Sequence, residues 1–184
     1  AKRISNIIKP GEMSSLEWQL TLRRQQAQKE DFAIREADPV RAPGEYTVGN
    51  AKTRNEYRVS FYGEGHPLNS CSCMDFRTSR IGSCKHLEAV AAWIPAVKGR
   101  CVHKPEEGLT RIYMDYSSQP CPRIVYGDEG RKLRSVFKGL FSRDGRLKIQ
   151  EAPRLLPAIR DAAQLGVPFR CHDDAMEWAA VQMD

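Results

Sequence analysis

The chain has 184 residues, a formal net charge of +6 at pH 7 and six cysteines. This length allows one moderate domain or two small ones, with a core that needs no disulfides. No apolar run approaches the length of a membrane span and no signal peptide is visible, so we expect a cytoplasmic protein with reduced thiols and no membrane partner.

The first 44 residues are expected to form an extended lead, a helix and a linker. Ser14 and Glu17 fit a capping box, in which the serine side chain caps the helix and the glutamate side chain reaches back to the serine. The helix should end before Asp38 and Pro39, because the residue before a proline is disfavoured in a helix.

Residues 45–104 are expected to contain a β-hairpin and a metal site. Tyr46 and Val48 alternate with smaller residues, the stretch 57–61 alternates in the same way, and the stretch 50–55 between them is rich in turn formers. A lone hairpin is marginally stable, so this one needs a further element against its apolar face.

Four potential metal ligands follow the hairpin in the form CxC, ten residues, CxH; they are Cys71, Cys73, Cys84 and His86. Three thiols and one imidazole suit tetrahedral zinc, which binds cysteine sulfur and histidine nitrogen. Because protein fills all four positions, none remains for water, and this is the pattern of structural rather than catalytic zinc. We therefore expect one structural Zn²⁺.

Other arrangements of these residues stay open. The four could be buried cysteines and a core histidine without a metal, or two thiols could form a disulfide, although a CxC pair makes a poor bridge. Cys101 with His103, or Cys171 with His172, could close the site in place of the second pair.

The helical pattern behind Cys84 favours this residue as the third ligand. Apolar residues at 87, 90, 91 and 94 fall at helical spacing, and Ser83 is the expected N-cap. Cys84 and His86 would then lie in the first turn, where free backbone N–H groups favour a thiolate. The cysteines at 101, 121 and 171 are expected to be packing residues.

Residues 105–184 are expected to form a small α+β unit. Strands are predicted at 111–116 and 123–126, followed by helices around 133–140 and 155–163 and a last helix capped by Asp173 or Asp174. The predicted fold class is therefore α+β: an N-terminal helix, a hairpin–zinc–helix module, and this C-terminal unit.

The positive charge is uneven along the chain. The excess of Lys and Arg over Asp and Glu is +2 in residues 1–44, +4 in 45–104 and 0 in 105–184. A basic bias permits contact with nucleic-acid phosphates. The candidate residues are six cations of the middle segment: Lys52, Arg54, Arg58, Arg77, Arg80 and Lys85. Alternatively, some only balance the metal site, because three thiolates on a divalent zinc leave a charge of about −1.

A CxC and CxH set between a hairpin and an apolar helix resembles the SWIM zinc finger, over roughly residues 45–97. The resemblance implies that the four residues named above are zinc ligands. The flanks at 13–25, 112–116 and 171–175 resemble the region that precedes the motor in bacterial Swi/Snf-family helicase-like ATPases. The chain departs from that family in one respect, because these residues contain no G-x-x-x-x-G-K phosphate-binding loop.

The expected function is therefore that of a zinc-stabilised accessory region of a bacterial Swi/Snf-type ATPase, with its C-terminal motor as a partner. It would bind DNA weakly and non-specifically, or position the motor. The alternative is a protein-interaction module that docks a motor or another partner through Trp18, Trp93 or the C-terminal apolar face, without touching DNA. We expect no enzymatic activity in this chain, since its remaining Cys and His residues lack a flanking pattern for catalysis.

Overall fold

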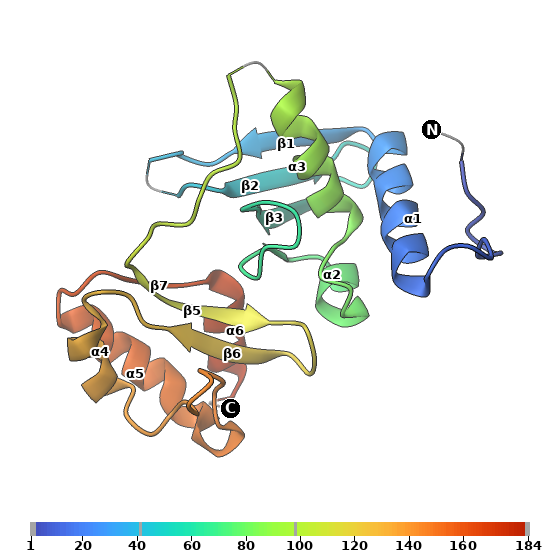
Figure 1. Ribbon diagram of the computed structural model, residues 1–184. Helices are drawn as coiled ribbons and strands as arrows, with labels where there is room; N and C mark the ends of the chain where they lie inside the picture. The colour runs from blue at the N-terminus through green and yellow to red at the C-terminus, as the bar shows by residue number, and fades with distance from the viewer. Residues whose placement is uncertain (1–2, 41, 98, 183–184) are drawn as a thin grey trace. The chain divides into compact units, whose positions relative to one another are not determined.

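The computed structural model of the protein describes residues 3–40, 42–97 and 99–182. The chain divides into an N-terminal unit, Ala1–Pro105, and a C-terminal unit, Glu106–Asp184 (Figure 1). The predicted α+β class is confirmed, because the described residues form one antiparallel four-stranded sheet, one three-stranded sheet and six α-helices. No helix in these ranges is both long and apolar enough to cross a membrane.

The predicted boundaries after residues 44 and 104 stay predictions, although the first two predicted segments both lie in the N-terminal unit. This unit opens with helix α1, Ser15–Lys29, which begins at the expected capping box. The Ser14 hydroxyl accepts the backbone N–H of Glu17 at 3.2 Å, and the Glu17 carboxylate accepts that of Ser14 at 2.8 Å.

The helix ends at Lys29, before Asp38 and Pro39 as predicted, but the sequence did not indicate the strand that comes next. Strand β1, Phe32–Glu36, follows directly and pairs with strand β2, Glu45–Asn50, so that Ile34 lies opposite Val48. The segment alternates between half-buried and exposed residues with the period of a strand. Pairing with β2 therefore determines the conformation of this segment.

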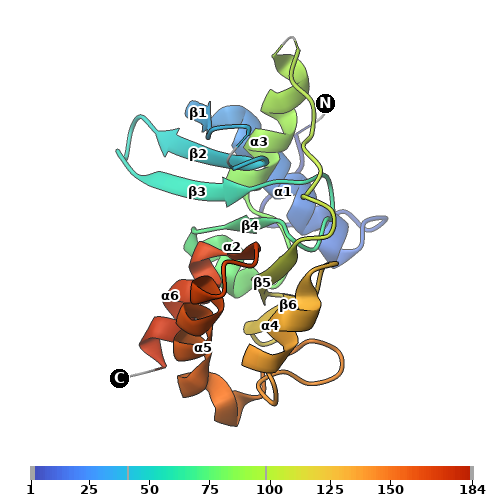
Figure 2. The same ribbon diagram turned by 90° about the vertical axis from the view of Figure 1, so that its left-hand side faces the viewer.

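The predicted hairpin is confirmed as β2 with β3, Glu56–Ser60, and it forms the centre of the sheet. The two-residue strand β4, Ser70–Cys71, adds to the outer side of β3, and the strand order is β1-β2-β3-β4. Figure 2 shows β4 beside β3, leading into the short helix α2, Met74–Ser79. The sequence did not indicate β4 or α2.

Helix α3, Lys85–Ala96, lies across one face of this sheet, with α1 beside it (Figure 1). Leu87, Val90 and Ile94 are buried on the inner side of α3. The predicted Ser83 N-cap is wrong, because the N-cap is Cys84, whose sulfur accepts the backbone N–H of Leu87 at 3.5 Å. The Ser83 hydroxyl instead donates to Glu88 at 2.6 Å.

The second sheet, in the C-terminal unit, joins strands β5, Thr110–Asp115, β6, Cys121–Val125, and β7, Phe169–Cys171. The strand order is β6-β5-β7, with β5 antiparallel to β6 and parallel to β7. The two predicted strands are thus confirmed as β5 and β6, and β7 was not foreseen.

Three helices share a core with this sheet: α4, Gly130–Val136, α5, Ala152–Gln164, and α6, Asp173–Val181. The core is continuous from Ile112 on β5 through Phe137 to Leu155 on α5. The residue before α6 is His172, so the predicted aspartate cap is wrong; both aspartates lie in the first helical turn, where their charge favours the helix dipole.

His172 makes the stability of the C-terminal unit depend on pH. Its side chain is buried and its Nε2 atom has no hydrogen-bond partner in the described structure. Burial, followed by the charges of Arg170 and Arg111, lowers the pKa of His172 to about 3. In the unfolded chain the imidazole of His172 has a pKa near 6.5, so between about pH 6.5 and pH 3 it is protonated in the unfolded chain but not in the folded one. The free energy of unfolding therefore falls as the pH drops through this range.

We expect this group to remove on the order of 2–3 kcal/mol from the unfolding free energy between about pH 7.5 and about pH 4.5. Hydrogen exchange of the C-terminal unit in the wild type and in His172→Gln measures the difference. The variant should lose most of the dependence on pH. A wild type and variant that respond equally to acid would contradict the assignment.

Candidate metal centre

The structure brings Cys71, Cys73, Cys84 and His86 together as one buried cluster. Each offers one ligand atom, and these four atoms lie within 4.8 Å of one another. Cys71 ends β4 and Cys73 precedes α2, while Cys84 and His86 belong to the start of α3. The cluster therefore joins the edge of the sheet to the first turns of two helices.

The backbone holds each sulfur in place. The N–H of Cys73 donates to the Cys71 sulfur at 3.5 Å, and the N–H of Phe76 donates to the Cys73 sulfur at 3.4 Å. Cys73 and Cys84 are the N-caps of α2 and α3, so their sulfurs face the positive ends of these helices. Such an environment favours thiolates, the form that binds a metal.

The thiols also interact with one another. Hydrogen bonds from Cys71 and then from Cys84 lower the pKa of Cys73 well below its usual range. The hydrogen bond to Cys73, followed by that to Cys84 and by burial, raises the pKa of Cys71. Without a cation the three sulfurs therefore share protons, and a divalent cation between them would replace these protons.

Two aromatic rings fix the imidazole of His86. The ring of Tyr57 is stacked on it at a centroid distance of 4.1 Å, and the ring of Phe32 meets it edge-on at 5.3 Å. In this orientation the Nδ1 atom lies 3.7 Å from the Cys71 sulfur and 4.0 Å from the Cys84 sulfur. Nδ1 is therefore the nitrogen that could complete the donor set.

This donor set fits a tetrahedral metal ion. A site with metal–sulfur distances of about 2.3 Å places neighbouring sulfurs roughly 3.8 Å apart, which is compatible with ligand atoms that all lie within 4.8 Å of one another. Three sulfurs and one nitrogen suit zinc better than magnesium or calcium, which prefer oxygen ligands. No other group of three or more Cys, His, Asp or Glu ligands of this kind occurs in the part of the chain that the structure describes.

The alternative ligands lie elsewhere. His103 is paired with Glu36, its Nε2 atom lying 2.6 Å from the carboxylate. Cys101 is exposed, so the prediction of a packing role for it is wrong, whereas Cys121 and Cys171 are partly buried. Burial, followed by the charges of two nearby aspartates, raises the pKa of Cys171 to about 12, which makes it a poor metal ligand.

Helix α1 is fastened to the metal-binding elements by ion pairs that sequence reasoning missed. Arg23 binds Asp75 in the first turn of α2 with two hydrogen bonds of 3.0 and 2.6 Å. Glu30, at the C-terminus of α1, accepts Lys85 at 2.6 Å and the side-chain amide of Asn50 at 2.9 Å. Charge pairs so far apart in sequence have no local signal, so only the folded structure reveals them.

The six candidate DNA-binding cations come from different segments. Lys52 and Arg54 lie in the exposed loop of the β2–β3 hairpin, where Arg54 adopts a left-handed conformation with φ 57°. Arg58 lies on β3, while Arg77 lies in α2 and Arg80 at its C-terminus. Lys85, the sixth, is held by Glu30 and belongs to the support of the metal centre.

A groove of about 770 Å³ lies beside α1, β1 and α3. Its lining is largely apolar and includes Phe32 and Trp93. Its charged residues include Arg24, which pairs with Glu64 and Glu88. The lining also includes Glu30, which is paired with Lys85, and Asp31, so acidic side chains outnumber basic ones in the groove.

The fold and the site define an α+β protein with a buried Cys₃His cluster suited to a metal ion. Comparison of the chain with protein-family models, with curated proteins and with solved structures gave no match. The residues of the metal centre and their geometry are therefore the observations that bear on function.

Proposed function

We propose that this chain is a zinc-stabilised accessory region of the SWIM type from a Swi/Snf-type DNA-dependent ATPase, where it binds DNA non-specifically or positions the motor. One observation carries the proposal: the CxC and CxH pairs meet in one buried cluster between a hairpin and an apolar helix. This is the arrangement that the family resemblance implies.

The ion in this proposal is a single structural Zn²⁺. It would connect β4, α2 and α3, three elements that are each too short or too weakly paired to be stable alone. With four protein ligands the ion has no open position for a substrate, so its role is to stabilise the fold.

The proposed DNA contacts are phosphate contacts without base recognition. Lys52, Arg54 and Arg80 are exposed cations for which the described structure provides no ion pair. Lys85, in contrast, is committed to Glu30 and is removed from the set of DNA candidates. Non-specific contacts of this kind correspond to dissociation constants of about 10⁻⁴ to 10⁻⁶ M near physiological salt.

The test replaces Lys52, Arg54 and Arg80 together by serine and measures binding to two unrelated DNA duplexes by fluorescence anisotropy. We expect both affinities to fall by roughly tenfold, and the dependence on salt to weaken by about 0.9 per lost contact on a log–log scale. Retained zinc and an unchanged unfolding midpoint are the controls. If the folded variant binds both duplexes as before, the DNA contact lies elsewhere or the protein-docking alternative is correct.

The protein-docking alternative needs tryptophan side chains that are free to contact a partner, but the three tryptophans make contacts within the protein. Trp18 donates its indole N–H to the carbonyl of Ser5 at 2.9 Å. Trp93 is covered by the guanidinium of Arg100, 3.9 Å from its ring centroid. Trp178, on the C-terminal apolar face, packs against the core of its own unit. These contacts favour the DNA-binding proposal over docking through the tryptophans.

We also propose that the chain has no catalytic activity of its own. These 184 residues contain no phosphate-binding loop, and ATP hydrolysis would belong to a motor domain. The purified chain should therefore hydrolyse ATP no faster than buffer, with or without DNA. Turnover that persists after rigorous purification and depends on the amount of this protein would contradict the accessory role.

A further inference from the structure

The C-terminal unit has a formal net charge of zero over residues 105–184, but its positive charge is concentrated in one segment. Residues 128–148 contain seven Lys and Arg against three Asp and Glu, an excess of +4. The remainder of 105–184 contains five against nine, an excess of −4. The charge of this unit is thus divided, and its positive part coincides with α4 and the turns that follow it.

These cations are exposed and are not neutralised within the protein. The side chains of Arg131, Lys132, Lys138 and Arg143 are exposed and make no ion pair or hydrogen bond with any described residue. Other arginines of the unit are paired: Arg123 binds Asp115, Arg154 binds Glu151, and Arg111 binds Glu106. Apart from Arg160 on α5, the exposed cations of this unit that have no ion pair among the described residues therefore lie on this segment.

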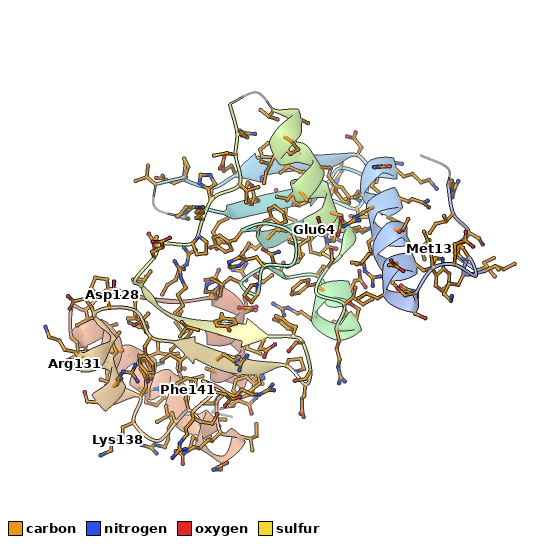
Figure 3. All side chains as sticks on the ribbon, in the orientation of Figure 1. Met13, Glu64, Asp128, Arg131, Lys138 and Phe141 are labelled. Atoms are coloured by element: carbon orange, nitrogen blue, oxygen red, sulfur yellow. The ribbon has the colours of Figure 1, made fainter. Side chains whose placement is uncertain are left out.

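Three of the cations follow one another along α4 and the turn after it. Arg131 and Arg134 lie one helical turn apart on α4, and Lys138 lies two residues beyond the end of this helix, while Leu133 and Phe137 are buried. The Arg134 guanidinium lies 4.3 Å above the ring of Tyr126, which limits its motion. Figure 3 shows Arg131 and Lys138 projecting outward on the same side of the unit.

The chemistry of this face fits a phosphate backbone better than a membrane. Apart from Lys132, the exposed positions between these cations are the small residues Ser135, Gly139 and Ser142, and the apolar Val136 and Phe141 are half-buried. Insertion into a lipid interface needs exposed, bulky apolar side chains. A series of exposed cations can contact successive phosphates and release their counterions.

We propose that the cationic face, defined as Arg131, Arg134, Lys138 and Arg143, is a phosphate-contacting surface for duplex DNA. It deepens the proposed function, since it rests on DNA as the partner. It is independent of the zinc site, because its residues belong to the C-terminal unit and its separate core.

The test uses the full, zinc-loaded chain with Arg131, Lys138 and Arg143 replaced together by serine, and two unrelated duplexes of about 20 base pairs. We expect affinity for both duplexes to fall at least about tenfold near 100 mM salt, and the salt dependence to weaken by roughly 2–3 on a log–log scale. A matched control replaces Lys104, Arg154 and Arg160 by serine, removing the same charge elsewhere, and should change affinity little. A third variant, Arg131→Lys with Arg143→Lys, keeps the charges and should keep binding.

The outcomes separate this inference from the proposed function. Equal losses in the two serine variants would mean that only net charge matters and would overturn the inference. Unchanged binding in the cationic-face variant, with loss in the Lys52, Arg54 and Arg80 variant, would overturn the inference and leave the proposed function standing. A wild type that binds neither duplex would overturn both. Binding to phosphatidylserine vesicles without binding to DNA would overturn the inference and identify a membrane surface as the partner of the cationic face.

Discussion

Replacing Cys84 by serine is expected to release the metal ion and unfold much of the N-terminal unit. Cys84 is both a donor to the cluster and the N-cap of α3, so the change removes a ligand and weakens the helix that covers the sheet. Structural zinc contributes an apparent binding free energy of about 10–16 kcal/mol in small metal-dependent domains, comparable with the total stability of a domain. Hydrogen exchange should show protection lost across residues 45–97.

The C-terminal unit should stay folded in this variant, because its core contains no residue of the metal cluster. Cys101→Ser is the matched control: it removes an exposed thiol and should change neither metal content nor protection. If Cys84→Ser retains a full equivalent of metal with native protection in the N-terminal unit, the ligand assignment is wrong.

The substitution Gly127→Ala is expected to unfold the C-terminal unit while leaving the metal centre intact. A β-carbon at residue 127 would lie 1.7 Å from the carbonyl oxygen of Gly108 and 2.6 Å from the carbonyl carbon of Leu109. Both are backbone atoms. Two hydrogen bonds hold residues 127 and 128 close to the start of β5. The Asp128 N–H donates to the Gly108 carbonyl at 2.8 Å, and the Gly127 N–H donates to the Thr110 hydroxyl at 3.0 Å.

An added methyl group must therefore separate the start of β5 from the turn that leads into α4. We expect a loss of more than about 4 kcal/mol, a large part of the stability of a small unit. Gly139→Ala is the control, because residue 139 has a φ of 83° but no atom within 4 Å of its added β-carbon. Strain alone should cost the control about 1 kcal/mol. Equal unfolding midpoints for the two variants would contradict the steric argument.

Local patterns predicted the central features of the N-terminal unit. The capping box at Ser14 and Glu17 acts within one helical turn, and the hairpin of β2 and β3 is marked by alternation on both sides of a polar loop. The spacing of the cysteines and His86 predicted the four potential ligands that the structure brings together. These features depend on residues close in sequence, and close residues leave a readable signal.

The remaining features depend on contacts between distant residues. Strand β1, which the sequence did not indicate, is stabilised by its pairing with β2. Cys84 displaces Ser83 as N-cap because its sulfur is held in the buried cluster and also reaches the backbone of α3. Arg23 reaches Asp75 across 52 positions, and no periodicity reveals such a pair.

The net charge of residues 105–184 did not indicate the positive segment 128–148, for a different reason. A sum over residues 105–184 gives zero because a positive segment and a negative remainder cancel. Such a sum contains neither the exposure of Arg131 and Lys138 nor the absence of ion-pair partners for both among the described residues. Electrostatic contacts act over about 10 Å in space, so the relevant sum is over a surface and not over a segment of sequence.

The measurement that tests the central claim most directly is metal analysis of the purified chain combined with X-ray absorption at the zinc edge. The account predicts one zinc per chain, with three sulfur neighbours at about 2.3 Å and one nitrogen neighbour at about 2.0–2.1 Å. The shell should be unchanged in Cys101→Ser and lost in Cys84→Ser. A chain that is fully folded with no stoichiometric metal, or a zinc shell that contains Cys101 or His103, would contradict the account.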